Sequence, residues 1–201
     1  MSVTISAELV KKLRDQTGAG MMECKAALTE AGGNIDEATV VLRKRGLAQA
    51  AKKAGRTANE GQIGTYIHTG GKIGVLIEVN CESDFVARTD DFQNLMKELA
   101  LQVAAANPQY VRREDVPETV LERERGIYRA QMEGSGKPAQ VIDKIIEGKL
   151  GSFYEQVVLM DQVSIRDPKT KVEQLVKAAI AKLGENIGVA RFVRYKVGEA
   201  T

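Results

Sequence analysis

The spacing of the apolar residues changes at Gly55, and this change constrains the fold more than any other feature of the sequence. Before Gly55, apolar side chains recur every three or four positions, which is the spacing of one face of an α-helix. Between residues 73 and 79 they occupy every second position, which is the spacing of a strand with one buried face. The chain is therefore expected to have an α+β fold with two domains, residues 1–55 and residues 56–201.

The first domain is predicted to be a compact bundle of three short helices. Ser6 is a suitable N-cap for the first helix, and Gly18 can end it in the left-handed conformation that glycine tolerates. Asn34 is predicted to cap the third helix, which is expected to end at Gly46. An alanine-rich segment, residues 47–55, is expected to form a separate connecting helix.

The second domain is predicted to contain a three-stranded antiparallel sheet. Residues 62–68 and 72–80 have the pattern of two strands joined by a Thr-Gly-Gly turn, which is a common signal of a β-hairpin. Residues 187–197 are rich in β-forming residues. We expect them to supply the third strand, because an isolated two-stranded hairpin is rarely stable.

Helical spacing predicts four further helices in the second domain. Their expected ranges are residues 90–107, 117–133, 138–158 and 169–183. The last two are separated by a loop around Pro168. They are expected to fold back on each other as a helical hairpin that spans residues 138–183.

The composition excludes several classes of function. The one histidine, His68, and the two cysteines, Cys24 and Cys81, are too few for a structural zinc site or a disulfide framework. The glycine-rich segments match neither a dinucleotide fingerprint nor a phosphate loop. No apolar run suggests a membrane span, and residues 1–12 lack the pattern of a signal peptide. We expect a cytoplasmic protein with reduced thiols, no cofactor or metal of its own, and no contact with membranes.

A basic stretch over residues 43–56 leaves one alternative open. It has no acidic residue, so it could bind the phosphates of RNA in a translation-associated protein, or an acidic protein. It could equally be a solvated helical face that complements the helix dipole. The basic side chains are Arg43, Lys44, Arg45, Lys52, Lys53 and Arg56.

A small enzyme is the second alternative. Glu78, Glu82 and Asp84 lie close together in the sequence and could supply an acid–base pair. Glu78 alternates with apolar neighbours and is therefore expected to face solvent.

The segment over residues 81–88 differs from an ordinary loop. Phe85 and Val86 lie among charged residues in a short turn after an apolar strand. Both could plug the core beneath the loop, or Phe85 could be an aromatic anchor for the pocket of a partner. Met21 and Met22 pose the same question, because two adjacent side chains at a helix start cannot easily both face inward, and thioethers suit contact surfaces.

Four segments, in this order, resemble the translation elongation factor Ts family. They are residues 17–25 (TGAGMMECK), 79–88 (VNCESDFVAR), 142–150 and 184–195. The resemblance covers essentially the whole chain. One departure is Ser83, which stands where such families usually carry threonine; the hydroxyl remains, and the packing of the methyl group is what changes.

The resemblance implies a fold and an assembly state. The fold is a ubiquitin-associated-like three-helix domain followed by an α+β core with an antiparallel sheet and a helical hairpin. Long members of the family carry a second copy of the core sheet unit, and one copy is visible in this sequence. The chain therefore resembles the short form, for which a homodimer through the core is expected.

The resemblance also implies a function without covalent chemistry. The family promotes release of GDP from elongation factor Tu, so the chain is expected to be a guanine nucleotide exchange factor and not an enzyme. Its expected partner is elongation factor Tu, both GDP-bound and nucleotide-free, with no direct contact to nucleic acid. By resemblance, displacement of the partner's Mg²⁺ belongs to Ser83, Asp84, Phe85 and Val86, and partner contact belongs to Met21 and Met22.

Overall fold

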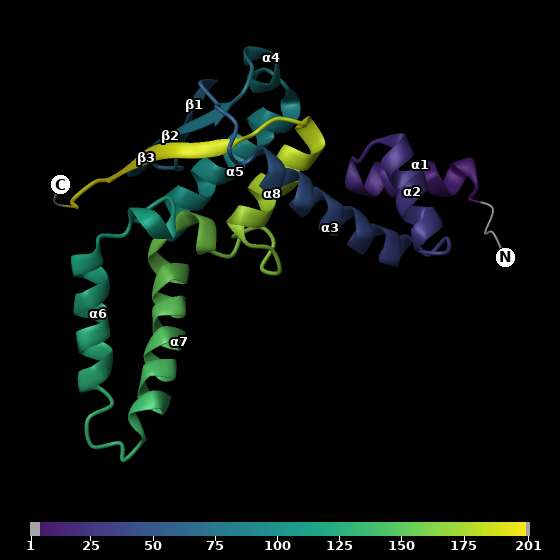
Figure 1. Cartoon of the computed structure of the whole chain (residues 1–201). Helices are drawn as coiled ribbons and strands as arrows, with labels where there is room; N and C mark the ends of the chain where they lie inside the picture. The colour runs from purple at the N-terminus through teal and green to yellow at the C-terminus, as the bar shows by residue number, and fades with distance from the viewer. Residues whose placement is uncertain (1–4, 200–201) are drawn as a thin grey trace. The chain divides into compact units, whose positions relative to one another are not determined.

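The computed structural model describes residues 5–199, which form two compact units (Figure 1). The first unit holds residues 5–62, 80–95 and 174–188, and the second holds residues 63–79, 96–173 and 189–199. Residues 1–4, part of the segment tested for a signal peptide, lie outside the described residues. None of the described helices is long and apolar enough to cross a bilayer. The domain boundary at residue 55 stays a prediction.

The three predicted N-terminal helices are present: α1 (Ala7–Thr17), α2 (Met21–Glu30) and α3 (Ile35–Lys53). The Ser6 hydroxyl accepts the third amide of α1, and the Asn34 side chain accepts two amides of α3, which confirms both predicted N-caps. Their apolar faces meet in one small core. Its buried members are Val10, Leu13, Cys24, Ala27, Leu28 and Ala38.

The predicted end of the third helix at Gly46 is wrong, because α3 continues to Lys53 as one helix. Gly46 has a different role, which is to let another helix come close. A Cβ atom at this position would lie 3.1 Å from the Cβ of Ala181 in α8 (Val172–Leu183). The glycine therefore permits a close helix contact that no local sequence signal reveals.

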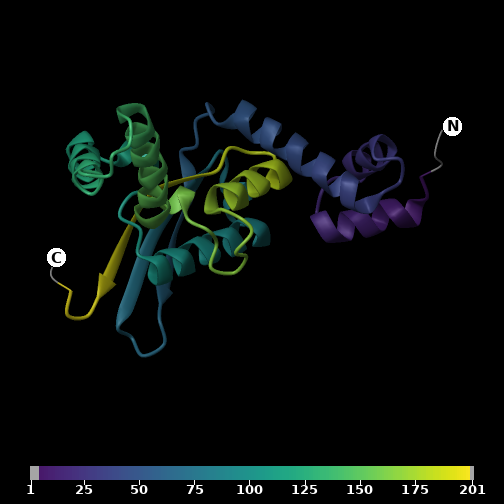
Figure 2. The same ribbon diagram turned by 90° about the horizontal axis from the view of Figure 1, so that it is seen from below.

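The sheet has the order β1 (Glu60–Ile67), β2 (Ile73–Cys81), β3 (Gly188–Lys196), as Figures 1 and 2 show. The amide of Val197 donates to the carbonyl of Lys72 at 2.9 Å, so the end of the last strand pairs with the start of the middle strand. This is antiparallel pairing. The predicted three-stranded antiparallel sheet is confirmed.

The two faces of the sheet differ. Helix α5 (Asp90–Ala106) covers one face (Figure 2), and the buried side chains of β2 lie on it: Val75, Ile77 and Val79. Gly64 of β1 lies against Met96 of α5, because a Cβ atom there would be 2.5 Å from the Met96 Cγ. The opposite face carries exposed apolar side chains. They are Ile63, Ile67, Leu76, Val193 and Tyr195.

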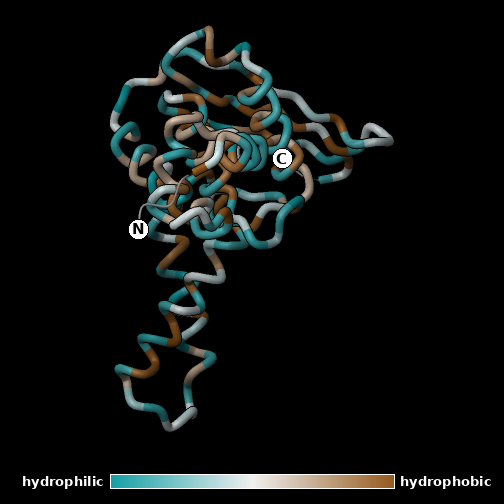
Figure 3. The backbone as a smooth tube through the Cα atoms, turned by 90° about the vertical axis from the view of Figure 1, so that its right-hand side faces the viewer, coloured by the Kyte–Doolittle hydropathy of each residue, from teal (hydrophilic) through white to brown (hydrophobic). Residues whose placement is uncertain are grey.

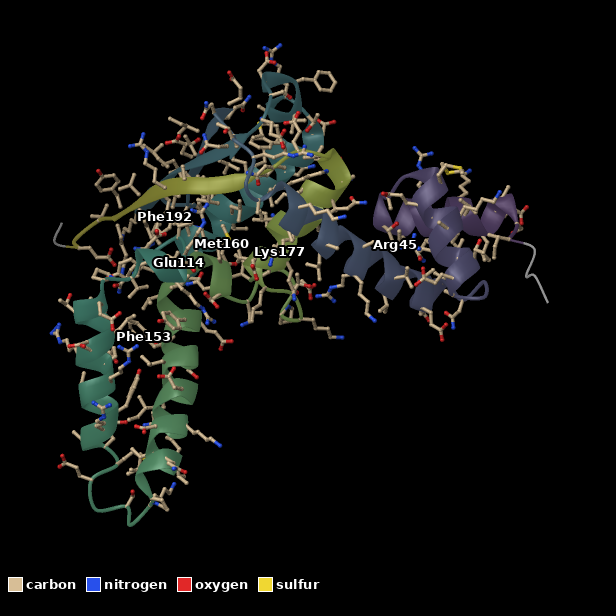
Figure 4. All side chains as sticks on the ribbon, viewed as in Figure 1. Arg45, Glu114, Phe153, Met160, Lys177 and Phe192 are labelled. Carbon is tan, nitrogen blue, oxygen red and sulfur yellow. The ribbon has the colours of Figure 1, made fainter. Side chains whose placement is uncertain are left out.

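The helical hairpin consists of α6 (Glu118–Ala130) and α7 (Ala139–Val157), which run side by side (Figure 1). The sequence predicts a hairpin of residues 138–158 and 169–183. The helix that packs along α7 within the second unit is α6, and the pairing with residues 169–183 stays a prediction. Hydrophobic positions recur along both arms (Figure 3), and Phe153 of α7 contributes to the core at their base (Figure 4). The choice of partner helix depends on these tertiary contacts, which the period of a single helix does not encode.

Two glycine-to-alanine substitutions are expected to change stability in opposite directions. Gly64→Ala forces Met96 to move and should lower the free energy of unfolding by about 1–3 kcal/mol. Gly148→Ala in α7 meets open space and should raise it by about 0.5–1 kcal/mol, because alanine favours helix. Urea unfolding monitored by circular dichroism measures both. Equal effects of the two substitutions would contradict the close packing of β1 on α5.

Candidate functional site

The segment that the sequence singled out forms a single helical turn with a hydrogen-bonded cap at each end. After β2 ends, α4 (Asp84–Ala87) makes one turn. The Ser83 hydroxyl is its N-cap and accepts the amide of Val86 at 3.4 Å. The Thr89 hydroxyl donates to the carbonyl of Val86 at 2.8 Å, and Thr89 is the residue directly before α5. The turn is therefore held by side chains on both sides.

Neighbouring side chains of α4 face in opposite directions. Val86 is 5% exposed and Ala87 is 2% exposed, whereas Phe85 is 75% exposed. The two alternatives for this loop thus apply to different residues: Val86 plugs the core, and Phe85 faces solvent. An exposed aromatic ring on a capped turn has the properties of an anchor for a pocket on another protein.

Asp84 is also exposed. Its carboxylate forms an ion pair with the guanidinium of Arg88, one turn later. Exposed pairs of this kind contribute little to stability. The Asp84 carboxylate can therefore exchange this partner for a group on another protein at small cost.

The carboxylate of Glu185 holds the start of the loop from a distant part of the chain. Its Oε2 accepts the amides of Glu82 and Ser83 at 3.1 and 3.0 Å, and its Oε1 accepts the Ser83 hydroxyl at 2.6 Å. No motif or spacing in the sequence points to Glu185 as a functional residue. The two segments are 102 residues apart, so no local spacing could have indicated the contact; the one available signal was the position of Glu185 within the family-like segment over residues 184–195.

In a second set of bonds, the loop supplies the acceptor and the segment around Glu185 supplies the donor. The carboxylate of Glu82 accepts the amide of Asn186 at 2.6 Å, and the guanidinium of Arg56 lies 3.6 Å from the same oxygen. The Asn186 side chain donates to the carbonyl of Arg56 at 2.7 Å. Glu82 and Asn186 therefore connect the loop, the segment before β3 and the connection after α3.

Cys81 supports the loop from below. Its thiol is buried and donates to the carbonyl of Ser83 at 3.1 Å. Burial, followed by the nearby charge of Glu185, raises the pKa of the Cys81 thiol. Cys24 is also buried and free, in the core of the N-terminal helices. Both thiols thus have the environment of structural cysteines.

Met21 and Met22 occupy the first turn of α2 and are both exposed, at 43% and 76%. The two side chains were expected not to face inward together, and in the structure both are exposed. They belong to the three-helix bundle, whereas the four loop residues belong to the turn after β2. The site residues named from the sequence thus form two separate groups on different elements.

The carboxylates of the enzyme alternative do not gather in one site. Glu78 pairs with Arg191 (2.8 Å), Glu82 accepts the Asn186 amide, and Asp84 pairs with Arg88. Within residues 5–199, no group of three or more histidine, cysteine, aspartate or glutamate side chains could hold a metal ion. Each of these three carboxylates therefore has a different partner within the chain.

Three of the six side chains in the basic stretch bind acceptors within the chain. Arg43 donates to Gln174 at 2.7 Å, Arg45 pairs with Glu30, and Arg56 lies beside Glu82. These contacts give half of the basic stretch a structural role. They favour the interpretation of a helical face over that of a phosphate-binding surface.

The chain is similar to one family over almost its whole length. A sequence model of the family described as "Elongation factor TS" matches residues 3–199. A protein of Solibacter usitatus named "Elongation factor Ts" is 58% identical over 196 residues, which cover 98% of this chain and 92% of the relative. Relatives of the same name from Caldanaerobacter subterraneus and Thermosipho melanesiensis are each 59% identical over 195 residues, covering 97% of this chain and 98% and 100% of the relatives.

The opposite burial of two adjacent residues predicts opposite effects on stability. Phe85→Ala should change the free energy of unfolding by less than about 0.5 kcal/mol, because the ring is exposed. Val86→Ala should lower it by about 2 kcal/mol, because buried methyl groups are lost. Thermal and urea unfolding of the two variants measure this difference. A large loss of stability in Phe85→Ala would mean that the ring is part of the core.

Proposed function

The chain belongs to the elongation factor Ts family, and we propose that it acts as a guanine nucleotide exchange factor on elongation factor Tu during translation elongation. Family membership supports an exchange factor in place of an enzyme, and cytoplasmic action beside its partner. The observation that carries the proposal is the exposed ring of Phe85, on a capped turn within a segment typical of the family. The partner is bound both with GDP and without nucleotide.

We propose that Asp84 and Phe85 act as a wedge. They insert between two helices of the GTPase beside its phosphate and Mg²⁺ site, while Ser83 and Val86 keep the shape of the turn. Mg²⁺ requires nearly ideal octahedral coordination. A small displacement of the groups around it therefore weakens the binding of both the ion and the nucleotide. The exposure of Phe85 and the hydrogen bonds of Ser83 support these separate roles.

The binding energy required is within reach of such a loop. The factor weakens GDP binding by the same ratio by which GDP weakens binding of the factor. A thousandfold effect corresponds to about 4 kcal/mol of coupling. Truncation of a single aromatic anchor at an interface commonly costs about 2–4 kcal/mol. A phenylalanine ring that becomes buried in the partner, together with a few polar contacts, can therefore supply this coupling free energy.

Met21 and Met22 form the second proposed contact with the partner. Both side chains are exposed in the first turn of α2, at 43% and 76%. Methionine adapts its shape to irregular surfaces. The pair is suited to lie on a helix of the same GTPase domain and to add affinity without entering the nucleotide site.

We further propose that the chain forms a homodimer through the exposed face of its sheet. This face carries apolar side chains on all three strands, among them Ile63 on β1, Leu76 on β2 and Tyr195 on β3. A contiguous exposed patch of this kind is typical of an interaction surface. The Glu78–Arg191 ion pair lies on the same face and gives it a polar margin. A second copy supplies an identical apolar face, which is the contact geometry of a two-fold dimer.

Exchange activity depends on the Phe85 ring in this proposal. With elongation factor Tu loaded with fluorescent GDP, the wild-type chain should accelerate nucleotide release, and Phe85→Ala should lower the acceleration by about 30-fold or more. The loss is expected at saturating factor, because the wedge itself is missing.

Val163→Ala serves as the matched control, since Val163 is an exposed apolar residue outside the loop. It should leave release unchanged. Wild-type nucleotide release that does not respond to the chain would reject the exchange function, and a fully active Phe85→Ala variant would reject the wedge.

The dimer predicts a defined mass in solution. Light scattering at micromolar concentration should give 43.8 kDa, twice the chain mass of 21.9 kDa. Leu76→Lys places a charge in the apolar sheet face and should give the monomer mass, with an unchanged fold because Leu76 is exposed. Val163→Lys, the control away from this face, should remain dimeric. A monomeric wild-type chain would contradict the dimer, and a dimeric Leu76→Lys variant would contradict the interface.

A further inference from the structure

We propose that Glu185 is a positioning residue that holds the Phe85 loop in its binding-competent shape before the partner arrives. The inference rests on the proposed exchange function, and it adds a residue that does not itself touch the partner. Its basis is the set of bonds from Glu82 and Ser83 to one carboxylate, which lies outside the loop.

The three bonds are of the strong, charge-assisted kind. Two backbone amides share one carboxylate oxygen of Glu185, and the Ser83 hydroxyl donates to the other at 2.6 Å. The same hydroxyl accepts the amide of Val86, so it passes the constraint from Glu185 into α4. The carboxylate therefore fixes the residue that begins the turn and, through it, the turn itself.

The position of Glu185 is fixed by its own surroundings. Helix α8 ends at Leu183, and the next residue, Gly184, has a φ of +80°, a conformation that residues with a side chain rarely adopt. The chain turns there, and the next amide but one, that of Asn186, donates to Glu82. Each of the two segments thus supplies a carboxylate that accepts backbone amides of the other: Glu185 accepts those of Glu82 and Ser83, and Glu82 accepts that of Asn186.

A clamp of this kind is needed because α4 has four residues. A single isolated turn of helix is unstable in water, since too few hydrogen bonds offset the ordering of its backbone. Without Glu185, the amides of Glu82 and Ser83 lose their acceptor, and the loop is expected to populate other conformations. The apparent dissociation constant of a binder rises in inverse proportion to the fraction of molecules in the competent conformation.

This mechanism predicts a kinetic signature that differs from that of the wedge. Loss of Glu185 raises the concentration of factor that gives half-maximal nucleotide release. At saturating concentration the partner selects the ordered loop, so the maximal rate stays near that of the wild type. Phe85→Ala instead lowers the maximal rate, because no concentration of factor restores the missing ring.

The test uses the full chain with Glu185→Ala, Glu185→Gln and the control Glu173→Ala, which alters an exposed glutamate in the first turn of α8. Glu185→Ala should raise the half-saturating concentration about tenfold. Glu185→Gln should raise it less, because its oxygen still accepts the two amides and its nitrogen can donate to the Ser83 hydroxyl, which is free to rotate. Glu173→Ala should behave as the wild type.

Hydrogen exchange of the Glu82 and Ser83 amides gives a readout that does not require the partner. Both amides should be protected in the wild type, lose protection in Glu185→Ala and keep part of it in Glu185→Gln. Unchanged protection and unchanged half-saturation in Glu185→Ala would overturn the proposal, and so would a lowered maximal rate with normal half-saturation.

Two further outcomes are a Glu185→Ala variant that does not fold and a wild-type chain that has no exchange activity. If Glu185→Ala fails to fold, Ser83→Ala removes the hydroxyl that donates to Glu185 and accepts the Val86 amide, and it leaves the two amide bonds to Glu185 in place. It should give the same signature to a smaller degree; its absence would count against the clamp. If the wild-type chain does not accelerate nucleotide release, the exchange function fails, and the amide protection still decides whether Glu185 orders the loop.

Discussion

The outward direction of Phe85 follows from the inward direction of the two residues after it. Successive side chains on a helix are about 100° apart, so a single turn cannot bury three consecutive residues against one core. In α4, Val86 and Ala87 occupy the core, and Phe85 is left on the solvent side. The hydroxyls of Ser83 and Thr89 bond to the backbone of Val86 and so stabilise this arrangement of the turn. The burial of a valine and an alanine thus determines the surface that the partner is proposed to meet.

Features with a local cause were predictable from the sequence. The caps at Ser6 and Asn34 depend on side chains that bond to amides two or three residues away, and the alternation in β2 reflects one buried face. Features with a distant cause were not. Gly46 resembles a helix end until Ala181 is known to lie against it, and a helical period does not reveal which partner α7 selects. The loop residues could be named from the sequence, but the contact of Ser83 with Glu185 could not, because it joins positions 102 residues apart.

The proposed mechanism places different demands on different residues of one short segment. The ring that enters the partner must be exposed and therefore contributes little to the stability of its own fold. The residues beneath and beside it carry that stability, through the burial of Val86 and the hydrogen bonds of Ser83. The hydrogen bonds of Ser83 involve its hydroxyl and its backbone amide.

The raised pKa of the Cys81 thiol has a consequence for how the loop responds to oxidants. Peroxides and electrophiles attack the thiolate, and a buried thiol that stays protonated offers them little of it. The thiol that donates to the Ser83 carbonyl is therefore expected to stay unmodified when oxidants are present. Burial and the raised pKa together make the Cys81 thiol less reactive toward oxidants than an exposed cysteine would be.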